Sequence, residues 1–114
     1  MEPTGTIPTE TIIRYVKGDT VFHVERRAEE VNVYYFAYFD RDTDETDEIS
    51  ASFPIEDYRQ GIEKLLAEGR CDIGGGRKHL NIKKDENGVN IDLHGGSYLG
   101  VYTSLPIEAE QFRL

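Results

Sequence analysis

Apolar and polar residues alternate over much of this chain, and this pattern predicts β-strands. Two such runs, residues 12–17 and 20–27, flank Gly18 and Asp19, a pair typical of the two-residue loop of a β-hairpin. The register that this loop sets brings four large apolar side chains onto one face. They are Tyr15 opposite Phe22 and Ile13 opposite Val24.

The segment Val31 to Phe39 is apolar on both of its predicted faces. Its β-branched and aromatic residues make it the strongest predicted strand in the chain. One face carries Val33, Tyr35, Ala37 and Phe39, and the other carries Tyr34, Phe36 and Tyr38. A strand covered on one side alternates apolar with polar residues, so we expect the second face to be covered or used as well. Helices on both sides, a second copy of the chain, or a ligand stacked on the rings would each do so.

A helix is predicted after a short strand at Ile49 to Phe53. Pro54 suits the first helical position, and the acidic Glu56 and Asp57 suit the positive end of the helix dipole. Apolar residues follow at helical spacing until Gly69, which ends the helix as a left-handed cap. These apolar residues are Ile55, Tyr58, Ile62, Leu65 and Leu66.

The second half of the chain predicts another hairpin. After a glycine-containing link at residues 70–76, strands at 79–84 and 89–94 flank a turn at Asn87 and Gly88. This turn predicts two cross-strand pairs, Ile82 with Leu93 on the inner face and Lys83 with Asp92 on the outer face.

Together these elements predict an α+β fold in a single domain, residues 12–114, after a flexible N-terminal lead-in at residues 1–11. We expect a curved antiparallel sheet of about seven strands, packed against one long and one short helix. The last strand spans residues 98–104. The short helix starts at Pro106 and has room for about two turns.

Two short segments of the chain resemble each other. Residues 52–56 read Ser-Phe-Pro-Ile-Glu, and residues 104–108 read Ser-Leu-Pro-Ile-Glu. One interpretation is an internal duplication with halves at 12–69 and 70–114, each made of three strands and a helix. The other is two independent helix starts that use the same capping chemistry. The sequence leaves both open.

The net charge of −9 is unevenly distributed. Residues 31–60 carry eight acidic and two basic residues, whereas residues 61–90 carry five acidic and six basic ones. An acidic excess repels phosphate groups, which argues against non-specific duplex binding. Five basic residues in the second half form either a local basic patch or a solvated strand surface. They are Arg70, Arg77, Lys78, Lys83 and Lys84.

Cys71 is the only cysteine, so no intrachain disulfide can form. This suits either a reducing compartment or a protein that simply needs no bridge, and we expect a cytoplasmic protein. No window approaches the roughly 18 apolar residues of a membrane span. Residues 1–11 lack the basic-then-apolar order of a signal peptide, and we expect no membrane association.

The acidic segment at residues 40–48 opens like a calcium-binding loop. However, the positions that require glycine and glutamate hold Glu45 and Ala51. A solvated acidic loop is therefore the favoured interpretation, with weak binding of a divalent cation as the alternative.

The histidines give no metal or catalytic signature. His79 and His94 project from the outer face of the second hairpin, with Asn81 opposite one and diagonal to the other. Two histidines without a third ligand make a poor zinc site, and no nucleophile signature surrounds Cys71. The glycines at 74–76 precede a strand instead of the helix of a phosphate-binding loop. We therefore predict no catalytic residue, metal or cofactor. An enzyme of unrecognised type would need a deep pocket holding one of these side chains.

Several strands followed by a helix, and then the same again, is the order of elements in two families of single-strand nucleic-acid binders. Across residues 12–114 the chain resembles these Whirly and PUR-domain families. It also resembles PUR repeats in closing each half with a strand, a proline and an apolar-spaced helix, at residues 53–66 and 105–114. The resemblance implies bases held over strand aromatics, and a paired-repeat or dimeric assembly. The chain departs from these families in its net charge and in lacking basic residues beside the stripe from Tyr34 to Tyr38.

The leading hypothesis is a non-enzymatic binding module that acts through a protein partner or self-association. A homodimer, or an acidic inhibitor or immunity protein of a nuclease, would be an example. The candidate interaction surface combines the aromatic stripe with the acidic loop, at Tyr34, Phe36, Tyr38, Asp40, Asp42 and Asp44. The alternative is single-strand nucleic-acid binding, with bases stacked on the strand aromatics.

Overall fold

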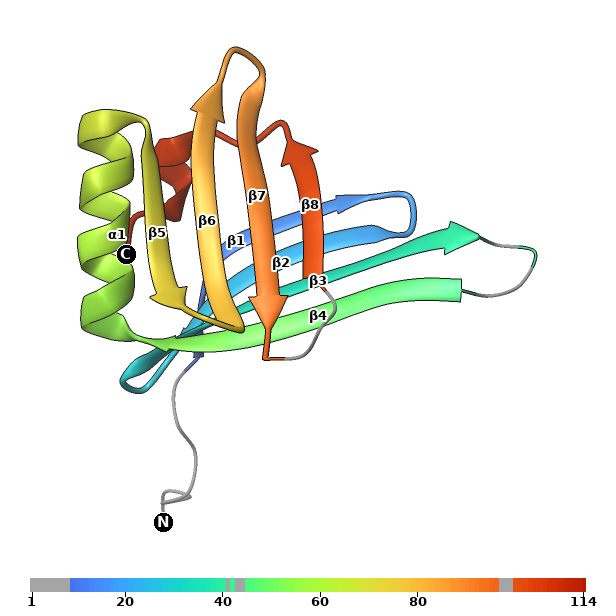
Figure 1. Ribbon diagram of the computed structural model, residues 1–114, viewed down its shortest axis with the longest axis horizontal. Helices are drawn as coiled ribbons and strands as arrows, with labels where there is room; N and C mark the ends of the chain where they lie inside the picture. The colour runs from blue at the N-terminus through green and yellow to red at the C-terminus, as the bar shows by residue number, and fades with distance from the viewer. Residues whose placement is uncertain (1–8, 41, 43–44, 97–99) are drawn as a thin grey trace.

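The computed structural model describes residues 9–40, 42, 45–96 and 100–114. In this part of the chain, eight strands form two antiparallel four-stranded sheets, with a single α-helix between them in sequence (Figure 1). The N-terminal sheet contains β1 (Thr9–Lys17), β2 (Thr20–Arg27), β3 (Glu30–Asp40) and β4 (Glu45–Pro54). The helix α1 (Ile55–Glu68) follows. The C-terminal sheet contains β5 (Arg70–Gly75), β6 (Lys78–Asp85), β7 (Gly88–Gly95) and β8 (Gly100–Leu105), before the 3₁₀ turn η1 (Ala109–Phe112).

The expected α+β class with mostly antiparallel strands is confirmed, but the expectation of one sheet of about seven strands is wrong. The second half of the chain has four strands instead of the three predicted, so both halves have four. The additional strand is β5, which lies within the segment expected to be a link. Its residues Cys71 and Ile73 point into the core, whereas Asp72 between them is exposed. Pairing with β6 makes this short run a strand despite its glycines.

The register of the first hairpin is confirmed, and that of the second is wrong. Tyr15 pairs with Phe22 and Ile13 with Val24, as expected. In the second hairpin Ile82 pairs with Ile91 instead of Leu93. The turn lies one residue earlier than expected, because the Asn87 N–H donates a 2.8 Å hydrogen bond to the Asp85 carboxylate. The pairing therefore shifts by two residues, and Lys83 lies opposite Asn90 instead of Asp92.

The core lies between the inner faces of the two sheets. Figure 1 shows the strands of the C-terminal sheet crossing steeply over those of the N-terminal sheet. The sheets contact each other where β4 meets β7 and β8. The helix α1 packs mainly on β5, and η1 contacts both α1 and β1. The largest fully buried side chains come from both sheets and both helical elements, and include Phe22, Phe53, Tyr58, Leu80 and Phe112.

The C-terminal helix of about two turns is replaced by the single turn η1. The backbone of Glu108 and the side chain of Gln111 form part of a capping box at its start. Ala109 and Phe112 are both buried, and they are three residues apart. Side chains at this spacing lie above each other on a 3₁₀ helix, so one such turn directs both into the core.

The two similar sequence segments occupy the same place in the two sheets. Residues 52–54 end β4, and residues 104–105 end β8, in each case the last strand of its sheet. In both sheets the serine donates a hydrogen bond to an asparagine directly across the ladder. Ser52 pairs in this way with Asn32, and Ser104 with Asn90. The order of elements is therefore four strands and a helical element, twice.

Candidate functional site

The outer face of the N-terminal sheet, which points away from the core, carries the aromatic stripe expected on β3. The inner residues Val33 and Tyr35 are buried, so alternation directs Tyr34, Phe36 and Tyr38 outward. The strand lies in the middle of its sheet, between β2 and β4. We call the outward residues of β1 to β4 the outer N-terminal face.

An apolar patch crosses the outer N-terminal face. Val16, Val21 and Phe36 lie side by side on β1, β2 and β3. Val16 is 52% exposed and Tyr38 is 40% exposed, so no other described element covers them. The rings of Phe36 and Tyr38 pack edge to face, with centroids 5.5 Å apart. This geometry is favourable for aromatic pairs and gives the patch a fixed shape.

Charged side chains flank this patch on opposite sides. Glu48 on β4 continues the row of Val16, Val21 and Phe36, and Arg14 is exposed on β1. The Tyr34 hydroxyl donates a 2.7 Å hydrogen bond to the Glu48 carboxylate. This hydrogen bond raises the pKa of Tyr34, because it stabilises the protonated hydroxyl.

The acidic loop is shorter than expected, because β3 extends to Asp40 and β4 begins at Glu45. Asp42 is exposed. Asp44 and the side chains of Phe39 and Asp40 lie outside the described part of the chain.

The expected basic residues do not form one surface. Arg70 and Lys83 lie opposite each other on the outer face of the C-terminal sheet. Lys78 instead lies near the Phe53 ring, 6.0 Å from its centroid. Arg77 is in the turn before β6, and Lys84 follows Lys83 on the other side of the strand.

The outer face of the C-terminal sheet carries mostly polar residues in a grid of rows, each row made of residues that pair across β5, β6, β7 and β8. We call it the outer C-terminal face. Its three rows are Arg70, Lys83, Asn90 and Ser104; Asp72, Asn81, Asp92 and Tyr102; and Gly74, His79, His94 and Gly100. An open groove of about 200 Å³ passes over the first two rows.

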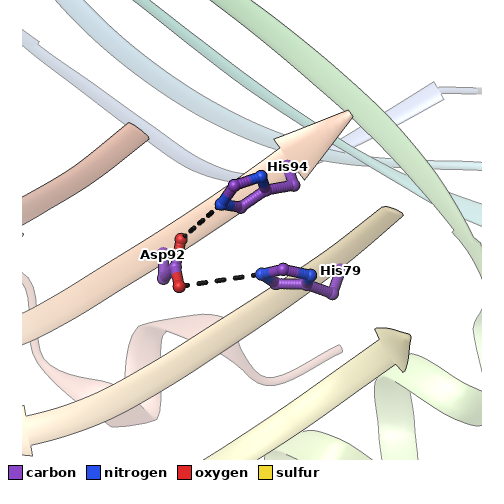
Figure 2. Close-up of side chains that lie close together, drawn as sticks. All are labelled: His79, Asp92 and His94. Carbon is purple, nitrogen blue, oxygen red and sulfur yellow. Dashed lines mark ion pairs between the residues drawn. The ribbon is translucent and has the colours of Figure 1, made fainter. Parts of the chain in front are cut away.

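Within this grid, His79, Asp92 and His94 converge, and we call them the His-Asp cluster. Figure 2 shows the carboxylate of Asp92 beside the two neighbouring imidazole rings, facing one nitrogen of each. Its Oδ1 lies 3.1 Å from Nε2 of His94, and its Oδ2 lies 3.6 Å from Nε2 of His79. The two rings are 4.4 Å apart between centroids. All three side chains are partly buried, with exposed fractions between 21% and 31%.

The backbone sets the proton position on His79. Its Nδ1 lies 3.0 Å from the carbonyl oxygen of Gly76. A carbonyl oxygen only accepts hydrogen bonds, so Nδ1 carries the proton and Nε2 of the neutral ring presents a lone pair. This Nε2 is buried and has no hydrogen-bond partner among the described residues. In the neutral ring, the atom that faces Asp92 is therefore an electron-pair donor.

The position of the His94 ring depends on a glycine. Gly100 lies directly across from His94 on β8. A Cβ at position 100 would lie 2.2 to 2.5 Å from three atoms of the imidazole ring. The absence of a side chain on Gly100 therefore leaves the space in which the His94 ring lies.

Cys71 does not belong to the same surface as the histidines. It is 3% exposed and points to the inner side of β5. Burial raises the pKa of the Cys71 thiol to about 11, which leaves little thiolate near neutral pH. A hollow of about 450 Å³ beside α1 is lined by Tyr58, Ile62, Leu66 and the C-terminal residues, and its lining contains no histidine or cysteine.

Sequence reasoning missed the His-Asp cluster because of the register of one hairpin. The expected turn placed His94 opposite Asn81, whereas the observed turn places it opposite His79. The side chain of Asp85, which fixes the turn through Asn87, was the available signal.

Comparisons with protein-family models, with curated proteins and with solved structures give no match. Among the described residues, no helix has the length and apolar character needed to cross a membrane.

Proposed function

We propose that this protein is a binding module that pairs with a second copy of itself through the outer N-terminal face. The observation that supports this most directly is the apolar patch of Val16, Val21, Phe36 and Tyr38, which lies in the open on a regular sheet. Exposed apolar patches on ordered surfaces are typical of protein interaction sites.

The charges around the patch favour a two-fold pair over a contact with an unlike protein. A two-fold axis parallel to the strands would place β1 of one copy over β4 of the other. Arg14 at one edge would then approach Glu48 at the opposite edge of the partner, twice. Such a self-complementary surface is what an isologous interface requires.

The size of the face predicts a weak dimer. Four strands about 4.8 Å apart and roughly seven residues long offer on the order of 500 Å² per copy. Stable interfaces bury about 800 Å² per partner, so we expect dissociation in the micromolar range. Analytical ultracentrifugation over a wide range of protein concentration measures this equilibrium.

The variant Val16→Glu tests the proposal at little structural cost, because this side chain is already half exposed. We expect it to weaken the dimer strongly, because the two-fold arrangement places position 16 of one copy over Glu48 of the other, so that like charges meet twice in the contact. The matched control is Tyr102→Glu on the other sheet, where the side chain is 73% exposed. A wild-type chain that stays monomeric at the highest concentration would contradict self-association and favour a basic protein partner, steered by the acidic β3–β4 segment.

A second candidate function is single-strand nucleic-acid binding. It is favoured by the order of four strands and a helical element, twice, which resembles the Whirly and PUR-domain families, and by the fixed Phe36 and Tyr38 rings. Stacked bases contribute about 1–3 kcal/mol each, but the net charge of −9 opposes binding. A fluorescent oligonucleotide titrated at low salt tests this function. Binding that weakens steeply with salt and is lost in Phe36→Ala would support it.

A further inference from the structure

We propose that the His-Asp cluster on the outer C-terminal face binds one first-row divalent transition-metal ion, with Zn²⁺ as the preferred probe. The ligands would be Nε2 of His79, Nε2 of His94 and a carboxylate oxygen of Asp92. This site lies on the other sheet from the apolar patch, so it does not depend on the proposed self-association.

The spacing of the three ligand atoms fits a single ion. Atoms about 2.0–2.1 Å from a tetrahedral Zn²⁺ lie roughly 3.3 Å from one another. The two nitrogen-to-oxygen separations in the cluster, 3.1 and 3.6 Å, bracket this value. All three ligand atoms lie within 4.8 Å of one another. Only small side-chain rotations are needed to bring them around one centre.

The state of His79 gives an independent reason to expect a cation. Its Nδ1–H is held by the Gly76 carbonyl, the outer-shell arrangement that orients most metal-ligating histidines. Its Nε2 lone pair then faces the negatively charged Asp92 carboxylate at 3.6 Å. Two electron-pair donors in contact repel each other unless a cation lies between them. A proton or a metal ion can fill this role, and His94 adds a third donor that suits a metal.

The scaffold holds the ligands before any ion binds. His79 lies on β6, and Asp92 and His94 lie on β7, the two central strands of the C-terminal sheet. His79 and His94 are direct cross-strand partners. Gly100 leaves the space that the His94 ring occupies. Little conformational entropy is therefore lost when the three side chains converge on an ion.

The donor set also selects the kind of metal. Imidazole nitrogen suits Zn²⁺, Co²⁺, Ni²⁺ and Cu²⁺, whereas Mg²⁺ and Ca²⁺ prefer sites made only of oxygen. Three protein ligands leave a position of a tetrahedral ion open to water or to a further ligand. The side chains are between 21% and 31% exposed, so an ion can enter from solvent.

The test uses the full chain after treatment with a chelator. Titration calorimetry with Zn²⁺ should give one equivalent, and Co²⁺ should give the visible absorption of a low-symmetry four- or five-coordinate site. Binding should weaken in acidic solution, because protons compete with the metal ion for the ligand atoms. Mg²⁺ should not compete.

Variants of each ligand should lower the affinity for Zn²⁺. Even outer-shell changes cost on the order of tenfold to a hundredfold, so His79→Gln, Asp92→Asn and His94→Gln should each cost at least this much. Gly100→Ala should also weaken binding, because it displaces the His94 ring without removing a ligand. The matched controls are His23→Gln, a histidine that also contacts a carboxylate, and Asp72→Asn, from the same row as Asp92. Both controls, and Val16→Glu, should retain wild-type affinity.

A measurement on the wild-type chain does not depend on whether a variant folds. NMR signals of the histidine ring nitrogens provide it. Zn²⁺ should shift the nitrogen signals of His79 and His94 and leave those of His23 unchanged. The absence of Zn²⁺ binding, or binding that persists in both Asp92→Asn and His79→Gln, would overturn the proposal. In the first case the cluster would be a proton-binding pair of histidines.

Discussion

The hydroxyl of Tyr58 on α1 donates a 2.5 Å hydrogen bond to the backbone carbonyl of Phe112 on η1. The two residues are 54 positions apart in the chain. Both side chains are fully buried. Burial raises the pKa of the Tyr58 hydroxyl, so it keeps its proton and remains a donor at pH values where an exposed tyrosine ionises. This bond ties the helix of the first half to the last turn of the second.

Removing this hydroxyl should destabilise the protein without disturbing its packing. In Tyr58→Phe the ring remains, but a buried carbonyl loses its partner, which costs about 1–3 kcal/mol. Urea denaturation followed by circular dichroism measures the change. Tyr102→Phe is the control, because that side chain is 73% exposed and should have no effect. Equal midpoints for the two variants would contradict a role for the buried hydrogen bond.

The ring of Phe112 is expected to contribute more than the hydrogen bond. It is fully buried and lies 6.1 Å from the ring of Phe22 between centroids. Phe112→Ala should cost about 3–5 kcal/mol, because a cavity remains where the ring was. Leu114→Ala, at a position that is 40% exposed, should change the midpoint little. A small effect of Phe112→Ala in the same urea titration would mean that η1 is not part of the cooperative core.

Gly61 in the middle of α1 should resist substitution by the best helix former. Alanine is favoured over glycine in a helix by about 1 kcal/mol. Here a Cβ would lie 2.4 Å from Cγ1 of the buried Ile73 on β5. Overpacking of this kind costs about 1–3 kcal/mol, so Gly61→Ala should lower the stability on balance. A higher melting temperature would show that β5 can move away from the helix. The control is Ala67→Gly at an exposed position of α1, which measures the difference in helix propensity between alanine and glycine without any change in packing.

The buried thiol of Cys71 predicts a loss of stability in alkaline solution. Its pKa is raised to about 11 in the folded chain, whereas a thiol in the unfolded chain ionises near pH 8.5 to 9. Above that pH the unfolded state releases a proton that the folded state retains. The free energy of unfolding should therefore fall between about pH 9 and pH 11, by up to about 3 kcal/mol.

The slope of this pH dependence separates Cys71 from Tyr58, whose pKa is also raised by burial. Cys71→Ala lowers the stability at every pH by creating a cavity, but it should flatten the decline above pH 9. Urea midpoints at a series of pH values measure both effects. Parallel curves for the wild type and the variant would show that Cys71 does not carry the pH dependence.

The sequence predicted which side of most strands is buried, but not every pairing between strands. Side chains on a strand alternate between its two faces, so the alternation of apolar and polar residues identifies the inner ones. Phe22 on β2, Ile82 on β6 and Leu93 on β7 were assigned to the inner face in this way. A shift of two residues keeps every side chain on its own face, so the wrong register in the second hairpin left the predicted burial intact. The shift nevertheless decides whether His79 meets His94.

The division into two sheets was not predictable from local pattern. The strand β5 has only Cys71 and Ile73 as inner residues and ends in glycines, so it has no strong signal without its partner β6. The doubly apolar character of β3 was correctly assigned to two faces, and one of these faces is the core. The other face carries the apolar patch, and the self-association proposed above would cover it.

The crossing of the two sheets includes a close contact made by a glycine of β7. A Cβ at Gly95, the last residue of β7, would lie 2.5 Å from the carbonyl oxygen of Ser50 on β4. Even the smallest addition there would push the sheets apart. Gly95 directly follows His94. The same short stretch of main chain therefore sets both the distance between the two sheets and the position of the His94 ring beside His79. Natural variation at position 95 should therefore be constrained even in relatives whose surface residues have diverged.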